Sequence, residues 1–206
     1  MKQLFWGDSG VVDLVAHQLK SGNVVLAEGD TVLGLLADLS IEGRAELDRI
    51  KSRSNKPYIV LVADSKKALN FIAEKSNNIF QIEKIINNFW PGPLTLIVKA
   101  GGKVPDGICS INGAIALRVP QHPGLLELLK RFDGIFSTSA NLSGGAIPEH
   151  VNDVDPAVIQ EVSCVVLNDQ GYHAQSVPST IIDCTGEEIV VVREGAVTMD
   201  QLKPLL

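Results

Sequence analysis

The sequence predicts a single α/β domain built on a twisted mixed β-sheet that is flanked by helices. Early in the chain, helical patterns alternate with extended ones, which is typical of strands connected by helices. Later extended runs follow one another more closely, and this favours local strand pairing and a mixed sheet. With 206 residues and 45% hydrophobic side chains, the chain can bury one core of this kind, so a single domain over 1–206 is expected.

The helices and strands are expected where apolar spacing and turn residues change along the chain. Amphipathic spacing predicts helices at 11–19, 41–50, 65–73, 77–88, 123–131 and 155–161, and a last one near Thr198. Apolar runs predict strands at 23–27, 57–62, 94–98, 114–119, 135–137, 162–167, 179–184 and 189–192. In the helix at 41–50, the residues expected to face the core are Ile41, Ala45, Leu47 and Ile50.

Composition excludes several classes of protein. The formal net charge is −6, so only a local basic cluster can bind an anion, and extended DNA binding is disfavoured. The three cysteines lack C-x-x-C spacing, which argues against a disulfide framework and a structural zinc site, and Cys164 and Cys184 fit core positions. No apolar run reaches the length of a membrane span, so we expect a cytoplasmic protein with no membrane contact.

Four cations fall between Arg49 and Lys56, at the junction of a helix and a strand. Lys51, Arg53 and Lys56 can converge there on an anion, since arginine offers phosphate a planar fork and lysine a point charge. Pro57 stops the helix and favours an extended Lys56. Taken alone, the segment is equally consistent with a solvated helix end, where cations suit the helix dipole.

A run of hydroxyls, an amide and a glycine follows a short apolar strand at Ser139-Ala140-Asn141-Leu142-Ser143-Gly144. Ser139 and Asn141, with the backbone N–H groups of such a turn, can form an anion-binding concavity. Alternatively, Asn141 only caps its own turn. Neither a G-x-x-x-x-G-K-[ST] loop nor a G-x-G-x-x-G loop is present, so the sequence supports neither P-loop nor Rossmann chemistry.

Further polar residues stand at predicted strand ends. Thr31 can bind a small polar substrate or cap a turn, and Asp30 beside it is interpreted as a turn residue in preference to a metal ligand. Arg118 and Arg193 each follow four apolar residues, so each is expected at the end of a strand, on the rim of the sheet. There they can bind a ligand or, alternatively, form ordinary surface salt bridges. Ser179 begins a strand. No H-x-x-x-H, H-E-x-x-H or G-x-S-x-G pattern occurs, which disfavours a zinc or serine hydrolase.

Seven motifs, each weak alone, together resemble the YrdC-like family, whose members are L-threonylcarbamoyladenylate synthases. The motifs are Asp30-Thr31-Val32-Leu33-Gly34-Leu35, Lys51-x-Arg53-x-x-Lys56-Pro57, Trp90-Pro91-Gly92-Pro93-Leu94-Thr95, Ala116-Leu117-Arg118-Val119-Pro120, Ser139-Ala140-Asn141-x-Ser143-Gly144, Pro178-Ser179-Thr180-Ile181-Ile182-Asp183 and Val192-Arg193-x-Gly195. Their order makes the resemblance highly specific, and it covers nearly the whole chain.

The resemblance implies a reaction in which L-threonine, bicarbonate and ATP give threonylcarbamoyl-AMP and pyrophosphate. The product feeds the N6-threonylcarbamoyladenosine (t6A) modification of tRNA, so tRNA or a t6A transferase complex is a possible partner. The implied fold has a concave, positively charged groove, and the chain resembles the short, single-domain form. Mg²⁺ is expected with the triphosphate, but the sequence contains no carboxylate that must bind a metal.

The resemblance also implies roles for individual residues. Lys51 and Arg53 would be catalytic, with Lys51 close to the reacting phosphate and carbamate. The residues that would bind ATP are Arg53, Lys56, Ser139, Asn141 and Arg193. The residues that would bind threonine are Thr31, Arg118 and Ser179, with Arg118 on the carboxylate.

Three positions depart from the family pattern, all on the threonine side. Glu28-Gly29 replaces the usual Pro-Thr, Leu33 replaces an aromatic residue, and Leu61 stands where a histidine is common. Two alternatives to the synthase are a YrdC-like paralogue with an RNA- or nucleotide-binding role and no synthase activity, and a non-catalytic RNA-binding module. The Ser-Ala-Asn turn and the Lys-x-Arg pair favour the synthase. The net charge of −6 and the presence of only two Trp and two Tyr argue against stacking on single-stranded RNA.

Overall fold

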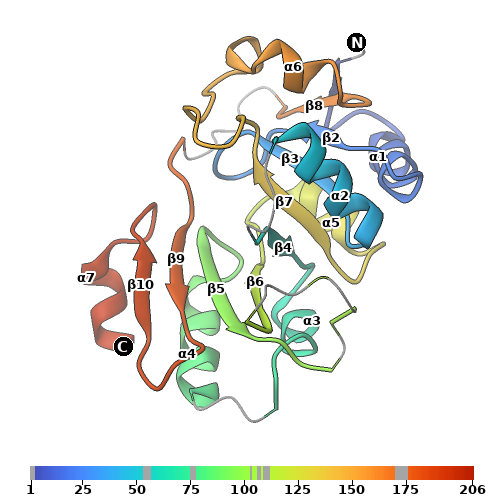
Figure 1. The fold of residues 1–206 in the computed structure, drawn as a ribbon. Helices are drawn as coiled ribbons and strands as arrows, with labels where there is room; N and C mark the ends of the chain where they lie inside the picture. The colour runs from blue at the N-terminus through green and yellow to red at the C-terminus, as the bar shows by residue number, and fades with distance from the viewer. Residues whose placement is uncertain are drawn as a thin grey trace.

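A ten-stranded mixed sheet runs through the described part of the chain (Figure 1). This computed structural model describes residues 3–52, 57–74, 78–102, 104–105, 108, 112–169 and 176–206. The strands are β1 (Gln3–Phe5), β2 (Val25–Ala27), β3 (Gly34–Asp38), β4 (Ile59–Leu61), β5 (Leu94–Lys99), β6 (Ala114–Arg118), β7 (Ile135–Ser139), β8 (Val165–Leu167), β9 (Thr180–Asp183) and β10 (Val190–Arg193). Their order in the sheet is β1-β8-β2-β3-β7-β4-β6-β5-β9-β10.

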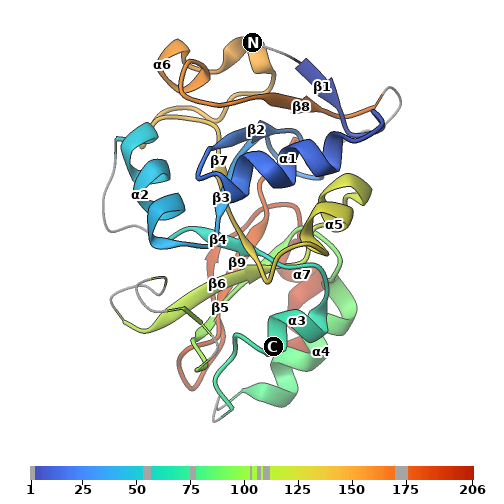
Figure 2. The same cartoon turned by 90° about the vertical axis from the view of Figure 1, so that its right-hand side faces the viewer.

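The predicted α/β class with a twisted mixed sheet is confirmed. Parallel pairs such as β4 with β6 and β5 with β9 stand beside antiparallel pairs such as β3 with β7 and β5 with β6. The strands turn progressively across the sheet, as Figures 1 and 2 show. The two described ends of the chain lie far apart.

Helices cover both faces of the sheet. They are α1 (Val11–Lys20), α2 (Ile41–Ile50), α3 (Ser65–Leu69), α4 (Ile79–Phe89), α5 (Pro123–Leu129), α6 (Pro156–Ile159) and α7 (Met199–Leu202), with 3-10 turns η1 (Val151–Asp153) and η2 (Lys203–Leu205). One core holds the apolar faces of α1 and α5, which contact each other (Figure 2). The other holds those of α2 and α4. Alternate strand residues enter each core, as Leu35 and Leu36 do in β3.

Helix α2 has the predicted bounds, but only part of its predicted inward face is buried. Leu47 and Ile50 are buried, whereas Ile41 is 60% exposed and Ala45 is also exposed, so those two predictions are wrong. The buried stripe passes instead through Gly43, Leu47 and Ile50. A Cβ on Gly43 would lie 2.3 Å from the carbonyl oxygen of Asp38, so a glycine lets the helix approach β3 closely.

Two strands were not predicted. β1 is a three-residue strand at the edge of the sheet, paired only with β8 among the described residues. β3 begins at Gly34, shortly after Asp30 and Thr31, for which a turn was expected. It pairs with β2 and β7. Gly34 and the polar residues before it do not favour a strand by their own propensity. This strand is buried because β2 and β7 lie on either side of it.

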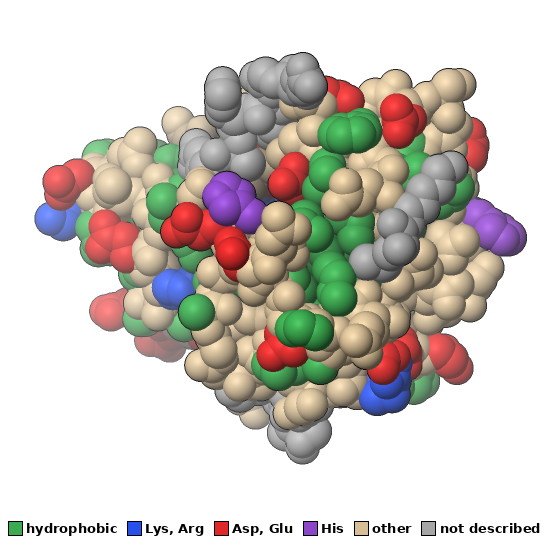
Figure 3. Space-filling view, turned by 90° about the horizontal axis from the view of Figure 1, so that it is seen from above, with side chains coloured by type: hydrophobic (Ala, Val, Ile, Leu, Met, Phe, Trp, Pro, Cys, Tyr) green, Lys and Arg blue, Asp and Glu red, His purple; other side chains and the backbone are tan. Residues whose placement is uncertain are grey.

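Cys164 and Cys184 are core residues, as predicted, and burial raises the pKa of the Cys184 thiol to about 12. None of the described helices has the length and hydropathy of a membrane span. The face seen from above in Figure 3 has acidic side chains across it and Lys or Arg at only a few places. In an acidic chain, the position of each basic residue therefore matters more than the number.

Candidate active site

A cavity of about 220 Å³ lies against the middle of the sheet and brings together five of the predicted site residues. These five are Thr31, Arg118, Ser139, Ser179 and Arg193. The other lining residues are Val32, Gly34, Pro57, Tyr58, Ile59, Ser137, Thr138, Ile147, Pro178 and Ile181. The lining residues lie on or beside six strands of the sheet, so residues far apart in the sequence meet in this cavity. Among the described residues, the lining includes two arginines and no acidic residue.

Arg118, the last residue of β6, is 5% exposed and makes three contacts in the site. Its Nη2 donates to Oδ2 of Asp30 at 2.6 Å, and its Nη1 donates to Oγ1 of Thr31 at 3.0 Å. Its Nε donates to the carbonyl oxygen of Gly92 at 3.0 Å. Because these acceptors come from two separate loops, the planar guanidinium is fixed in one orientation.

Asp30 does not cap a turn but pairs with Arg118 inside the protein, which corrects the interpretation of Asp30 as a turn residue. Its Oδ2 accepts from both Arg118 and the backbone N–H of Gln121, the latter at 2.7 Å. The ion pair is buried, with 7% of the Arg118 side chain and 9% of the Asp30 side chain exposed. The surface salt bridge considered for Arg118 is therefore also wrong, since the pair lies inside the protein.

Arg193, the last residue of β10, lines the same cavity. Its Nη2 and Nε donate to the carbonyl oxygen of Ser179 at 2.7 and 3.2 Å. Partial burial, and secondarily the positive charge of Arg118, lower the pKa of Arg193. Both guanidinium groups line the same cavity, and two positive charges there favour the binding of an anion.

Ser179 is a buried residue directly before β9. Its hydroxyl contacts a side chain that the sequence did not indicate as part of the site. Its Oγ lies 2.8 Å from Oγ1 of Thr95, a fully buried residue of β5. Thr95 stands within the Trp90–Thr95 motif, so the motif was a signal, although the pairing with Ser179 needed the parallel register of β5 and β9.

The Ser139–Asn141 turn follows β7 and lies over the side chain of Lys51. Lys51 Nζ donates to the carbonyl oxygens of Ser139 and Asn141 at 2.5 and 2.6 Å. Ser139 Oγ donates to Oδ1 of Asn141, and Asn141 Nδ2 donates to the carbonyl oxygen of Gly145 at 2.6 Å. Ser139 lines the cavity, whereas Asn141 stands beside it in the same turn. Arg53 and Lys56, the other cations predicted for this site, lie outside the described residues.

A small recess of about 20 Å³ opens beside Thr31 and Arg118. Its apolar lining residues are Ala27, Val32, Leu36, Leu61 and Leu125. Gly29 also lines it, and a Cβ there would lie 3.0 Å from Cδ1 of Leu125. Two of the three departures from the family pattern, Gly29 and Leu61, are therefore next to the arginine predicted to hold threonine. Leu33 is instead a buried core residue.

Hydrogen bonds from Asn168, which in turn contacts His122, hold the loop that carries Asp30 and Thr31. Asn168 donates from Nδ2 to the carbonyl oxygen of Gly29 at 3.2 Å, and its N–H donates to Oε2 of Glu28 at 2.7 Å. His122 Nε2 lies 2.8 Å from Oδ1 of Asn168, while its Nδ1 accepts from the N–H of Leu125 at 3.1 Å. No spacing signal in the sequence indicated these positions.

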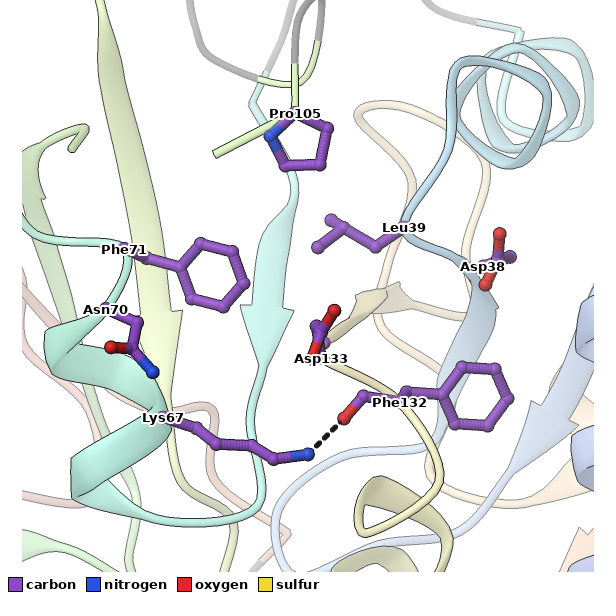
Figure 4. A pocket seen from close by; sticks show the side chains of 9 residues that line it. Asp38, Leu39, Lys67, Asn70, Phe71, Pro105, Phe132 and Asp133 are labelled. Carbon is purple, nitrogen blue, oxygen red and sulfur yellow. Dashed lines mark hydrogen bonds between the residues drawn. The ribbon is translucent and has the colours of Figure 1, made fainter. Parts of the chain in front are cut away.

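A larger cavity of about 370 Å³ lies at the opposite ends of β3 and β7 (Figure 4). Phe71 and Leu39 face each other across it, and Lys67 Nζ donates to the carbonyl oxygen of Phe132. None of the predicted site residues lines it. The larger volume of this cavity therefore does not make it the functional site. The predicted polar residues lie together in the smaller cavity instead. Within the described ranges, no cluster of three or more His, Cys, Asp or Glu residues could hold a metal ion.

Comparison with known proteins gives a consistent family. The family model for Sua5, YciO and YrdC proteins, described as "Telomere recombination", matches residues 17–195. A protein of Methanocaldococcus jannaschii, provisionally named a threonylcarbamoyl-AMP synthase, is 32% identical over 195 residues, which cover 93% of this chain and 89% of the relative. The threonylcarbamoyl-AMP synthase of Vibrio vulnificus is 29% identical over 184 residues, covering 88% of this chain and 96% of the relative.

The fold is also shared with a longer archaeal protein. The crystal structure of Pyrococcus abyssi Sua5 in complex with L-threonine superposes with a TM-score of 0.86 and 26% sequence identity. The superposition covers 99% of this chain but 60% of that chain, so this chain spans less than two thirds of the archaeal protein. The family match over most of the chain and the shared fold lead to one conclusion: the chain belongs to the Sua5/YciO/YrdC family.

Proposed function

We propose that this chain is an L-threonylcarbamoyladenylate synthase, which converts L-threonine, bicarbonate and ATP to threonylcarbamoyl-AMP and pyrophosphate. The observation that carries the proposal is the single cavity in which Arg118, Arg193 and the Ser139 turn meet. Relatives named for this activity, and the Sua5 structure obtained with L-threonine, support it. This activity would make the chain a nucleotidyltransferase that serves the t6A modification of tRNA.

One end of the cavity suits an amino acid. A carboxylate can bind the guanidinium of Arg118, because arginine offers paired donors to a planar anion. Asp30 and Gly92 hold that guanidinium in place, and the hydroxyls of Thr31 and Ser179 lie in the same cavity. These hydroxyls can contact the amine or hydroxyl of threonine. The small apolar recess at Leu61 adjoins this end.

The other end suits a triphosphate. Ser139 and Asn141 present a hydroxyl and an amide at a turn, and Arg193, which donates to the carbonyl oxygen of Ser179, adds a cation to the same cavity. Arg53 and Lys56 are proposed to complete this end. Lysine and arginine groups around a triphosphate offset its charge, as they do in other phosphoryl-transfer sites.

The reaction explains why cations are needed between the two ends. The threonine amine adds to bicarbonate to give a carbamate, with loss of water. A carbamate oxygen then attacks the α-phosphorus of ATP, and the bond to pyrophosphate breaks. Two anions have to meet in this step, so positive groups lower its barrier by stabilising charge on the phosphoryl oxygens. We assign this contribution to Arg53 and, indirectly, to Lys51.

Magnesium is expected to arrive with the triphosphate. The described residues that line the cavity include no acidic residue, so they do not make a protein site for Mg²⁺. The product is a mixed carbamic–phosphoric anhydride, which hydrolyses easily, so hand-over to tRNA by a t6A transferase complex is proposed. That route places the reaction in the cytoplasm, and it involves neither DNA nor a membrane.

The test is the dependence of pyrophosphate release on each substrate. We expect release from ATP only when L-threonine and bicarbonate are both present, with a product of the mass of threonylcarbamoyl-AMP. Unchanged pyrophosphate release without threonine would refute the synthase. Binding of tRNA that weakens with salt and needs no ATP, in a chain without pyrophosphate release, would instead support the RNA-binding paralogue.

A further inference from the structure

The ammonium group of Lys51 lies beneath the Ser139–Asn141 turn and not on the wall of the site cavity. Lys51 is the C-cap residue of α2, it is only 1% exposed, and it does not line the cavity. A buried ammonium needs oxygen acceptors, because an isolated buried charge is strongly disfavoured. The acceptors it contacts therefore indicate its role.

Both the side chain and the backbone of Lys51 hold this turn. Its Nζ donates to the carbonyl oxygens of Ser139 at 2.5 Å and Asn141 at 2.6 Å, and it lies 3.5 Å from Oδ1 of Asn141. The backbone N–H of Ser143 donates to the carbonyl oxygen of Lys51 at 3.2 Å. One residue at the end of α2 thus fixes the turn at three points.

These contacts decide which way the peptide groups of the turn face. In a trans peptide the N–H points away from the carbonyl oxygen. The Ser139 carbonyl faces Lys51, and the following N–H of Ala140 accordingly reaches the carbonyl oxygen of Leu33 at 3.0 Å on the other side. By the same geometry, the Asn141 carbonyl faces Lys51 and the N–H of Leu142 points away from the ammonium. The lysine therefore turns backbone donors away from itself.

We propose that Lys51 is a positioning residue, which holds the Ser139–Asn141 turn in the conformation that binds the phosphates of the nucleotide. Its ammonium remains on the two carbonyl oxygens and does not touch the reacting atoms. This inference rests on the proposed function, because it assigns the phosphates to this turn. It replaces the expectation that Lys51 lies close to the reacting phosphate and carbamate.

The first experiment compares Lys51→Met with Lys67→Met. Lys67 is a matched control, because its ammonium also donates to carbonyl oxygens, those of Leu129 and Phe132, at the other cavity. In Lys51→Met we expect calorimetry to show a roughly tenfold to hundredfold loss of ATP affinity, as for hydrogen bonds to a charged group. Amide exchange at 140–145 should accelerate, and threonine affinity should not change.

Lys67→Met should leave ATP affinity and exchange at 140–145 as in the unaltered chain. The proposal is overturned if Lys51→Met keeps both at the unaltered values yet releases no pyrophosphate, since lysine would then act on the reacting atoms. It is also overturned if Lys67→Met loses as much ATP affinity as Lys51→Met, since the effect would then be a general loss of stability.

A double-mutant cycle with Asn141→Ala separates the two roles further. If Lys51 acts through the turn, Lys51→Met should reduce ATP affinity much less in the Asn141→Ala background than in the unaltered chain. Equal reductions in both backgrounds would mean that Lys51 binds ATP independently of Asn141 and would contradict the proposal.

A crystal structure of the unaltered chain with L-threonine and a non-hydrolysable ATP analogue needs no variant. We expect Lys51 Nζ within hydrogen-bond distance of the carbonyl oxygens of Ser139 and Asn141, with the phosphates on the far side of the turn. Nζ within about 3.2 Å of a phosphate oxygen would overturn the positioning role alone. Failure of the unaltered chain to bind ATP at all would overturn the proposed function, and the inference with it.

Discussion

The two ends proposed for the site cavity, one for threonine and one for the nucleotide, are built from different kinds of contact. At the threonine end, a buried ion pair joins Arg118 to Asp30, and a second side chain, Thr31, completes the arrangement. At the nucleotide end, the carbonyl oxygens of a turn surround the ammonium of Lys51. The first end depends on particular side chains, whereas the second depends on the conformation of the backbone. The two ends should therefore respond differently to single substitutions.

The largest effect is expected at the threonine end, from Arg118→Lys. An ammonium cannot replace three donors of a fixed guanidinium plane, so Asp30 and the Gly92 carbonyl lose partners in a buried place. Breaking a buried pair typically costs about 3–5 kcal/mol, and the lysine should recover part of this stability. We expect threonine affinity to fall by roughly a hundredfold or more, measured by calorimetry. ATP affinity should change little.

Arg131→Lys is the control for that substitution, because Arg131 pairs with Asp13 at the surface. Exposed pairs contribute about 0–1 kcal/mol, so this variant should keep both stability and threonine binding. Unchanged threonine affinity in a folded Arg118→Lys variant would show that the carboxylate binds elsewhere.

A smaller effect is expected at the nucleotide end, from Asn141→Ala. The change removes the side-chain contacts of Asn141 with Ser139 and Gly145, while the backbone carbonyl stays available to Lys51. We expect ATP affinity to fall roughly tenfold, the usual effect of losing one or two hydrogen bonds. Calorimetry with threonine should give the unaltered value. A loss of threonine affinity as large as that of ATP would contradict the separation of the two ends.

Ser179→Ala should affect the threonine end less than Arg118→Lys. It removes the hydroxyl that contacts Thr95 at 2.8 Å, but the carbonyl oxygen of Ser179 continues to hold Arg193. We predict a threefold to tenfold loss of threonine affinity, roughly one neutral hydrogen bond. Thr185→Ala, which removes a surface hydroxyl bonded to Asp183, is a suitable control. Threonine titrations indistinguishable from the unaltered chain would remove Ser179 from the site.

The smallest effect concerns pH and the network behind the threonine end. Burial lowers the pKa of His122, although its bond to Asn168 opposes the shift. The unfolded chain therefore binds more protons than the folded chain just below the ordinary pKa of about 6.5. Stability should fall as the pH decreases through this window, by at most about 1.4 kcal/mol per pH unit, and should be unaffected at higher pH.

Denaturant unfolding between about pH 7.5 and about pH 5.5 measures this dependence. His122→Asn keeps a side-chain acceptor for the N–H of Leu125 and removes the titrating group. We expect a flatter pH dependence in this variant. An equally steep one would assign the effect to other groups.

Local patterns predicted most of the fold. The apolar spacing and the Ser40 cap of α2 are properties of neighbouring residues, and the bounds of that helix were correct. β3 was missed because its burial depends on β2 and β7, which are distant in the sequence. For the same reason, Ile41 and Ala45 were assigned inward: the closeness of α2 to β3 at Gly43 sets the buried face.

The site was predicted in part. The cavity joins Thr31, Arg118, Ser139, Ser179 and Arg193, which sequence motifs had selected. The partners of these residues were not predictable, because Asp30 and Arg118 are 88 residues apart, and so are Lys51 and Ser139. A lysine after a helix suggests a solvated or anion-binding group. Lys51 is buried instead, because the fold brings the carbonyl oxygens of Ser139 and Asn141 to its ammonium. The roles of all these residues in binding and catalysis stay predictions.

The most direct measurement of the two-ended site is a calorimetric titration of ATP and of L-threonine into the same two variants, Arg118→Lys and Asn141→Ala. We predict that the first loses threonine and keeps ATP, and that the second loses ATP affinity and keeps threonine. If both variants weaken both ligands to the same extent, or if Arg118→Lys binds threonine normally, then the cavity does not hold the two substrates at separate ends.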